Sequence, residues 1–257
     1  MTVDTEVIGA VGVVRIDRPQ VRGAVDRPTA SALADAIESF DVDASLAAIV
    51  LAGTGGTFCA GADLHALTDP ERANRLEENL IGPMGPTRGR TRLPTIAAIE
   101  GHAVAGGLEL ALWCDLRVVA ADAVLGVFCR RVGVPLIDGG TVRLPRVVGM
   151  GVALDLILTG RAVDAAEAQR IGLANRVVAA GQAQAAAVEL GNGLAQWPRQ
   201  TMLSDLAAAR AAFDRPMDDA LLHEHRLGIA SLRAGGADDG VSAFRAGGGR
   251  HGRSDDL

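Results

Sequence analysis

Two acidic residues, Glu109 and Asp138, lie where a single carboxyl group can take up and release a proton. Glu109 follows a glycine-rich turn and belongs to the apolar run 108–113, where burial raises a carboxyl pKa while the start of a helix lowers it. Asp138 lies among apolar residues and glycines in the segment 135–141. Both are candidate general acids or bases. The alternatives are a carboxylate that only complements a helix dipole, for Glu109, and a plain turn residue, for Asp138.

Two glycine-rich turns indicate where backbone amides approach a ligand. The first occupies residues 53–64 after an apolar run, and the second occupies residues 100–107 just ahead of Glu109. The dinucleotide-binding fingerprint does not fit the first turn, because Phe58 stands where that pattern needs glycine. Two such turns at the ends of neighbouring strands supply two N–H groups to one oxygen, as an oxyanion hole requires. Glycines that serve only tight turns and close packing are the alternative interpretation.

Short apolar segments and helical spacing define the elements that position these turns. The order strand, helix, strand repeats along the first half of the chain, which predicts right-handed crossover units and an α/β fold. The predicted strands cover residues 7–16, 47–51, 95–99 and 116–119, and the helix between the first two covers residues 29–40.

The chain from residue 151 onward is rich in alanine, and its periodicity indicates helices. We divide the protein into a core, residues 1–195, and a C-terminal helical assembly region, residues 196–257. The last residues, 247–257, are expected to fray. The predicted helices of this part cover residues 164–171, 182–197, 201–213 and 217–232.

Composition excludes several classes of function. All 25 basic residues are arginine, so chemistry that needs a lysine is ruled out, including a Schiff base, a pyridoxal phosphate attachment and a Walker-type phosphate loop. The net charge is -6 with both signs interspersed, which argues against a nucleic-acid partner. No segment approaches about eighteen uninterrupted apolar residues, so we expect no membrane span.

The cysteines and histidines suggest no structural metal. Cys59, Cys114 and Cys129 are odd in number and far apart, which fits neither a disulfide framework nor a zinc knuckle. With no signal-peptide pattern at the N-terminus, we expect reduced thiols and a cytoplasmic location. His223 and His225 are a candidate metal pair, but no third ligand is apparent. A solvated helix face is the preferred interpretation, and no metal site is predicted.

Residues 58–64 and 99–110, which contain the two turns, resemble the signature segments of the enoyl-CoA hydratase/isomerase superfamily, also called the crotonase superfamily. The resemblance extends from residues 16–19 to residues 172–175 and covers most of the chain. It implies a spiral of β-β-α units, a C-terminal helical region used in trimerisation, and a homotrimer or a homohexamer of two trimers. The implied ligand is an acyl-CoA thioester, so coenzyme A is part of the substrate and no separate cofactor is expected.

The resemblance also implies roles for individual residues. The oxyanion donors are the backbone amides of Ala62 and Gly106, and Glu109 occupies the place of the first of two catalytic glutamates. The implied substrate-binding residues are Ala60, Gly61, Ala62, Asp63, Leu64 and Gly107.

The second catalytic glutamate of the family is missing here. Ungapped matching puts Cys129 at its position, and a thiol does not hold and deprotonate water as a carboxylate does. Asp138 is the replacement, since some isomerases of the superfamily carry an aspartate just before the equivalent Gly-Thr. A further departure is Gly23, where the family commonly has Asn, and we expect it to alter only a structural hydrogen bond.

These residues favour an acyl-CoA enzyme that hydrates a 2-enoyl-CoA or moves its double bond through a thioester enolate. Isomerisation is slightly preferred, because one or two isolated carboxylates suffice for it. The alternative is a non-catalytic acyl-CoA-binding or scaffold member that lacks the second glutamate. A serine hydrolase is not supported, because no G-x-S-x-G segment exists. Cys129 acting as a nucleophile would need a nearby histidine, and a sequence cannot show which residues lie near one another in space.

Overall fold

The central strands are the uninterrupted apolar runs of the sequence. In the computed structural model, which describes residues 2–77 and 81–246, β3 (Ala48–Gly53) and β4 (Thr95–Ile99) are buried almost throughout. They pair in parallel, as strands covered on both faces do. The six-stranded sheet has the order β1-β2-β3-β4-β6-β9, with the β1–β2 pair antiparallel. Its remaining strands are β1 (Val3–Ile8), β2 (Val11–Ile16), β6 (Leu116–Ala120) and β9 (Arg176–Val178).

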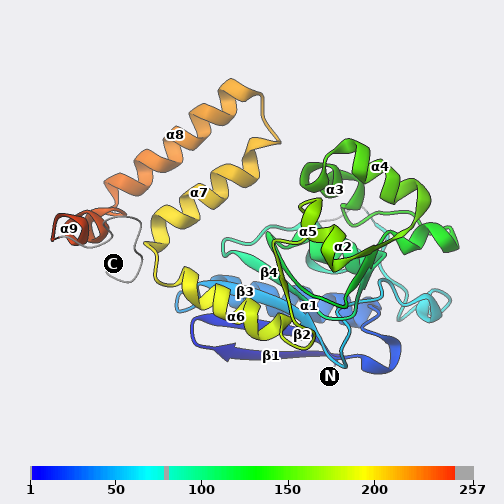
Figure 1. The fold of residues 1–257 in the computed structure, drawn as a ribbon. Coiled ribbons are helices and arrows are strands. Elements are labelled where there is room, and N and C mark those ends of the chain that lie inside the picture. Colours follow the sequence, from blue (N-terminus) through cyan, green and yellow to red (C-terminus); the bar gives the residue numbers. More distant parts are fainter. Residues whose placement is uncertain (1, 78–80, 247–257) are drawn as a thin grey trace.

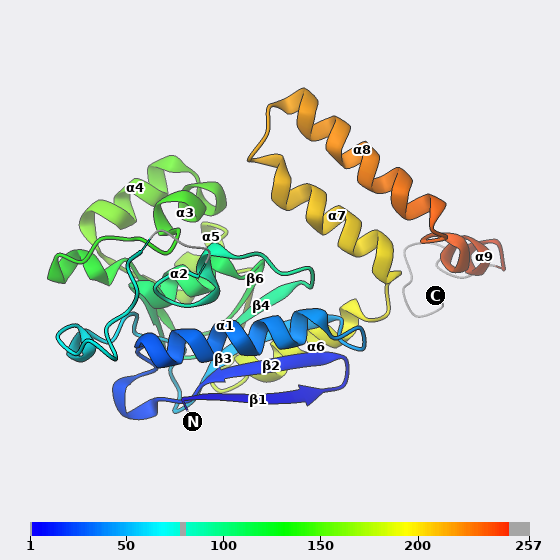
Figure 2. The ribbon, with the colours of Figure 1, turned by 180° about the vertical axis from the view of Figure 1, so that it is seen from behind.

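Helices α1 (Arg27–Val42) and α6 (Ala183–Leu194) cover opposite faces of this sheet (Figures 1 and 2). Successive residues of a strand point to opposite faces, so Val11 meets α6 while Gly12 meets α1. A Cβ at Gly12 would lie 2.5 Å from the Phe40 ring of α1, and a Cβ at Gly191 of α6 would lie 2.7 Å from Val11. Both helices therefore approach the sheet where a side chain is absent.

A second, three-stranded sheet has the order β5-β7-β8 and is formed by β5 (His102–Val104), β7 (Val124–Gly126) and β8 (Ala162–Asp164). Strand β4 leads into β5 after two residues, and α2 (Gly106–Trp113) follows. In the same way, β6 of the first sheet is followed along the chain by β7 of the second sheet. The repeated β-β-α units predicted from the resemblance are thus confirmed.

The remaining helices lie mostly in the second half of the chain. Helices α7 and α8 form a hairpin that projects away from the core (Figure 1). Among the described residues, no helix combines the length and the apolar character that crossing a membrane requires. The bounds are α3 (Gly140–Val148), α4 (Met150–Thr159), α5 (Ala165–Arg170), α7 (Arg199–Ala212), α8 (Met217–Arg233) and α9 (Asp238–Ala246), with short 3-10 helices at Pro19–Val21, Leu64–Ala66, Pro86–Arg88 and Phe128–Val132.

The predicted strand over residues 7–16 is wrong in one respect. The structure has two antiparallel strands there, joined by a turn at Gly9 and Ala10. Gly9 adopts φ +64°, which favours glycine, and the N–H of Ala10 donates to Asn192 Oδ1 of α6 at 2.8 Å. A partner 182 residues away in the sequence is invisible to local periodicity. The predicted fraying of residues 247–257 lies outside the described residues.

Four charged side chains anchor the first glycine turn to the start of α1. Arg18 Nη2 donates to Asp63 Oδ2 at 2.9 Å and lies 3.3 Å from Asp26 Oδ2, and Arg72 Nη2 bonds to the same two carboxylates. Arg18, Asp26 and Asp63 are buried. Asp26 also caps α1 by accepting from the N–H of Thr29. This network ties the turn that contains Ala62 to β2 and α1.

We predict that Asp63→Ala lowers the free energy of unfolding by about 3 kcal/mol, because it leaves the buried Arg18 with half of its acidic partners. Urea unfolding measures this loss. Asp4→Ala is the matched control, since Asp4 is the exposed partner of Arg15 at 2.8 Å, and it should cost less than about 1 kcal/mol. Equal small losses for both variants would show that the network does not anchor the turn.

Candidate active site

An apolar cavity of about 370 Å³ lies where the two glycine turns meet. Ala60, Ala62 and Leu64 of the first turn line it, together with Gly106 and Glu109 of the second unit. Most of the other lining side chains are hydrocarbon. They come from three segments that are distant in sequence: Leu67, Leu76, Met84, Val104, Phe128, Val132, Val134, Pro135 and Ile137.

Two backbone N–H groups on this wall are unpartnered. Within the described part of the chain, neither the N–H of Ala62 nor that of Gly106 donates a hydrogen bond to a protein acceptor. The two turns touch, because a Cβ built on Gly61 would lie 3.0 Å from the nitrogen of Gly106. Gly61 has φ +103° and meets no such clash as glycine. Since Ala62 and Gly106 both line the cavity, their two unpartnered amides are candidate donors to a ligand oxygen.

The residue before the second donor has a strained backbone. Ala105 caps α2 with φ 53° and ψ -126°, a region that residues with a Cβ rarely adopt. Its N–H donates to the carbonyl of Gly126 at 2.9 Å, which fixes the end of β5 against the end of β7. The conformation turns the chain sharply into α2, and the first amide of that helix is the one that lines the cavity.

Glu109 is buried on α2, and one of its oxygens is fully engaged. Oε1 accepts from the N–H of Asp138 at 2.9 Å and from the N–H of Gly140 at 2.8 Å. Oε2 accepts no hydrogen bond from any described residue. Burial raises the pKa of Glu109 to about 7, with the Gly140 N–H opposing the rise and the nearby Asp138 carboxylate adding to it. The group therefore exchanges its proton near neutral pH.

Asp138 is also buried and is held from the other side. Its Oδ1 accepts from the N–H of Met84 at 3.0 Å and from the hydroxyl of Thr87. Burial raises the pKa of Asp138, while these two donors and nearby guanidinium groups oppose the rise. The structure thus brings both predicted acids, Glu109 and Asp138, to one cavity.

Cys129, at the position of the missing glutamate, lines the same cavity from the 3-10 helix Phe128–Val132. Its residue is 5% exposed. Burial raises the pKa of the Cys129 thiol, and the Glu109 carboxylate raises it further. The resting side chain is therefore a neutral thiol beside a carboxyl group. Among the residues that the structure describes, no histidine lines this wall.

Three of the predicted substrate-binding residues do not line the cavity. The Asp63 carboxylate bonds to Arg18 and Arg72 and, through Oδ1, to the N–H of His65. Gly107 packs α2 against the first turn, since a Cβ there would lie 2.1 Å from the carbonyl oxygen of Cys59. Gly61 supplies the close contact described above. Gly61, Asp63 and Gly107 therefore support the backbone behind the cavity wall.

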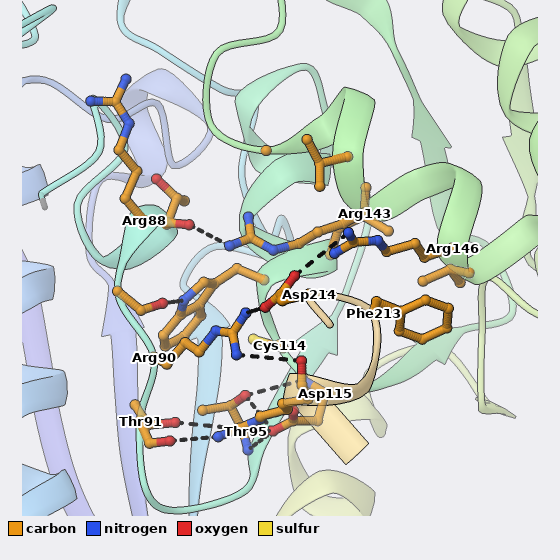
Figure 3. A pocket seen from close by; sticks show the side chains of 18 of the residues that line it. Arg88, Arg90, Thr91, Thr95, Cys114, Asp115, Arg143, Arg146, Phe213 and Asp214 are labelled. Atoms are coloured by element: carbon orange, nitrogen blue, oxygen red, sulfur yellow. Dashed lines mark hydrogen bonds and ion pairs between the residues drawn. The ribbon is translucent and has the colours of Figure 1, made fainter. Parts of the chain in front are cut away.

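A larger cavity of about 760 Å³ lies beside α7 and contains neither acid (Figure 3). Figure 3 shows Arg90 and Arg146 on either side of Asp214, and Asp115 beside them. Arg143, on its wall, donates to the carbonyls of Asp138 at 2.9 Å and of Thr87. Its guanidinium therefore braces the backbone of both segments that hold the Asp138 carboxylate.

Arg143 and Thr87 are the site residues that the sequence did not identify. Arg143 belongs to a segment that resembles the family, but nothing in that segment points to its two carbonyl acceptors. Thr87 lies in the loop 82–89, which has no periodic pattern. Among the described residues there is no group of three or more side chains suited to hold a metal ion, and His223 and His225 lie on α8.

The enoyl-CoA hydratase/isomerase family model matches residues 6–241. A probable enoyl-CoA hydratase, echA8, of Mycobacterium leprae (strain TN) is 33% identical over 234 residues, 91% of each chain. Enoyl-CoA hydratase EchA19 of Mycobacterium tuberculosis (strain ATCC 25618 / H37Rv) is 32% identical over 239 residues, 90% of this chain and 89% of its own. The crystal structure of enoyl-CoA hydratase EchA1 from Mycobacterium marinum matches with TM-score 0.90 at 30% identity, covering 95% of this chain and 96% of that one.

We predict that Glu109→Gln gains stability relative to the wild type as the pH rises. The folded pKa of Glu109 is about 7 against an ordinary value of 4.5, so the wild type loses stability as the pH increases through this interval. Glutamine accepts the same two N–H bonds and does not titrate. Because one pKa unit corresponds to about 1.4 kcal/mol, the advantage should grow by about 2 kcal/mol from about pH 5 to about pH 8. Urea unfolding at both pH values measures it, and a pH-independent difference would contradict the raised pKa.

Proposed function

Because the chain belongs to the enoyl-CoA hydratase/isomerase family, we propose that it binds an acyl-coenzyme A thioester and stabilises the enolate formed at its carbonyl. The observation that carries this proposal is the pair of unpartnered amides, Ala62 and Gly106, beside the buried Glu109. An enolate concentrates negative charge on the thioester oxygen, and preorganised N–H donors lower the energy of that charge. One such donor contributes about 3 kcal/mol to the transition state.

The proposed reaction is movement of a double bond along the acyl chain, with hydration of a 2-enoyl-CoA as the alternative. For a 3-enoyl thioester, a carboxylate removes a proton from C2, and the electron pair moves through the carbonyl as a dienolate. A carboxyl group then returns a proton at C4, which leaves the double bond between C2 and C3. Glu109 and Asp138 are the two groups that transfer these protons. Both have raised pKa values in this cavity, as proton exchange near neutrality requires.

Several features of the cavity support isomerisation over hydration. Hydration needs a second base that holds a water molecule, and at the position of the family's second glutamate this cavity has the neutral thiol of Cys129. Apart from Asn74, the remaining lining side chains are apolar, which suits an apolar acyl chain. Coenzyme A enters as part of the substrate, and the proposed reaction uses no separate cofactor.

We also propose that the protein assembles as a homotrimer or a homohexamer in the cytoplasm. The α7–α8 hairpin exposes large apolar side chains, among them Phe213, Met217, Leu221 and Leu222. Large apolar side chains exposed together on one hairpin are typical of a contact between subunits. The three free, buried cysteines fit a reducing compartment.

We predict that Glu109→Gln and Asp138→Asn each lower kcat by about a hundredfold to ten-thousandfold while leaving thioester binding nearly unchanged, because an amide keeps the shape but does not exchange the proton. Cys129→Ala should retain most of the activity. A panel of 2-enoyl-, 3-enoyl- and dienoyl-CoA thioesters with product identification measures the effect. If the wild type binds these thioesters and converts none, the protein is a non-catalytic acyl-CoA binder. If Cys129→Ala is inactive while Asp138→Asn is fully active, the second catalytic group is the thiol of Cys129 and not the carboxyl group of Asp138.

Multi-angle light scattering should give a mass of three or six chains. Leu221→Glu on the exposed face of α8 should shift the distribution toward the monomer, because it places a charge in the proposed contact. Val42→Glu, which alters an exposed apolar residue of α1 and not of the hairpin, is the matched control and should leave the mass unchanged. A purely monomeric wild type would remove the assembly proposal.

A further inference from the structure

The proposed proton transfer leaves one nucleophile of the cavity without a role, the thiol of Cys129. The register of the second sheet explains why Cys129 lies at this cavity. Strands β5 and β7 run parallel with Val104 opposite Gly126, so the residues that follow each strand emerge at the same edge. Gly106 and Glu109 follow one strand, and Cys129 follows the other. All three line one cavity, and a sphere of its volume, about 370 Å³, is about 9 Å across.

The backbone that carries Cys129 is fixed. Its carbonyl accepts from the N–H of Val134 at 3.1 Å across a turn in which Gly133 is left-handed. The neighbouring Arg131 lies over the Phe128 ring at 3.5 Å from its centroid and donates to the carbonyl of Gly160 at 2.9 Å. These contacts hold the backbone of the short helix that carries Cys129.

Glu109 supplies a base for this thiol. The side chain is 3% exposed, and its Oε2, which has no described partner, is the oxygen left to face the cavity. The sequence alone cannot show whether a histidine lies near Cys129. The structure places a carboxyl group there instead, one that is partly ionised at neutral pH because its pKa is about 7.

We propose that Cys129 is a covalent capture site, at which the thiol adds reversibly to C3 of a conjugated 2-enoyl thioester bound in this cavity. The inference rests on the proposed function, because the same two amides must polarise the thioester carbonyl. The ligand class is an α,β-unsaturated acyl thioester, which is also the product of the proposed isomerisation. The adduct occupies the cavity and so slows turnover when the conjugated product accumulates.

The step balances without any further reagent. The sulfur lone pair forms the S–C3 bond while the Glu109 carboxylate takes the thiol proton. The C2–C3 π pair moves to form the enolate, whose oxygen accepts from Ala62 and Gly106. Glu109 then delivers its proton to C2, and the thioester carbonyl is restored. One S–H and one π bond are consumed, one S–C and one C–H bond are formed, and coenzyme A stays attached. The reverse elimination releases the unchanged enoyl thioester.

Mass spectrometry of the intact protein tests the capture directly. After incubation with 2-butenoyl-CoA, the wild type should gain the mass of the entire thioester, and peptide mapping should place the gain on Cys129. Saturated butanoyl-CoA should add nothing. Cys129→Ser should show no adduct, and Glu109→Gln should slow adduct formation by at least about a hundredfold, the usual contribution of a general base. Cys114→Ser is the matched control, because Cys114 is equally buried but lies outside this cavity, and it should react as the wild type does.

The outcomes separate this inference from the proposed function. Butanoyl-CoA that binds in calorimetry while 2-butenoyl-CoA leaves no adduct would overturn the capture site and leave the proposed function standing. A gain of only the acyl mass would mean that the thiol attacks the carbonyl and expels coenzyme A, which also overturns it. If no thioester binds, both the capture site and the proposed function are wrong. As a second readout, incubation of the wild type with 2-butenoyl-CoA should cause a slow loss of activity that gel filtration reverses, and Cys129→Ser should lack that slow loss.

Discussion

The Glu109 carboxylate accepts two backbone hydrogen bonds from residues 29 and 31 positions later in the chain. These bonds connect α2 to the loop that precedes α3, and they bring Asp138 to the wall of the same cavity. Because both bonds go to one oxygen, the other is left toward the cavity. Burial of this carboxyl group costs stability, which the raised pKa expresses, and the two N–H donors offset only part of the cost. The site and its proton chemistry thus depend on the same interaction.

A second constraint fixes the turn on the opposite side. The buried network of Arg18, Asp26, Asp63 and Arg72 holds the first glycine turn, which contains Ala62, against the start of α1. Gly107 lets α2 pack directly on the backbone of Cys59. Since both donors are main-chain groups, the side chains behind the turns control them only by holding the backbone in place.

The chemistry of the cavity depends on the residue at the position of the family's second glutamate. A carboxylate there would polarise water, whereas Cys129 is a neutral thiol in a hydrocarbon wall. Glu109 of α2 and Asp138 of the loop before α3 both line this cavity, and the proposed function uses these two acids for proton transfer along an acyl chain without water. In the proposed function, the amides that stabilise the enolate also polarise the carbonyl of a conjugated thioester, and the proposed addition of the Cys129 thiol depends on this polarisation.

The sequence by itself determined the elements whose signals are local. The apolar runs of β3 and β4, the periodicity of α1, α7 and α8, and the family resemblance that points to Ala62, Gly106 and Glu109 are all readable in short segments. The sequence did not predict the features that depend on a residue distant in the chain. The turn at Gly9 depends on Asn192, and Asp63 faces two arginines of other segments and not the ligand. The bracing of Asp138 by Thr87 and Arg143, and the meeting of Cys129 with Glu109, arise from the pairing of β5 with β7 and the packing of α2. Hydrogen bonds and burial act between atoms that are close in space, and sequence spacing carries no record of them when the chain between is long.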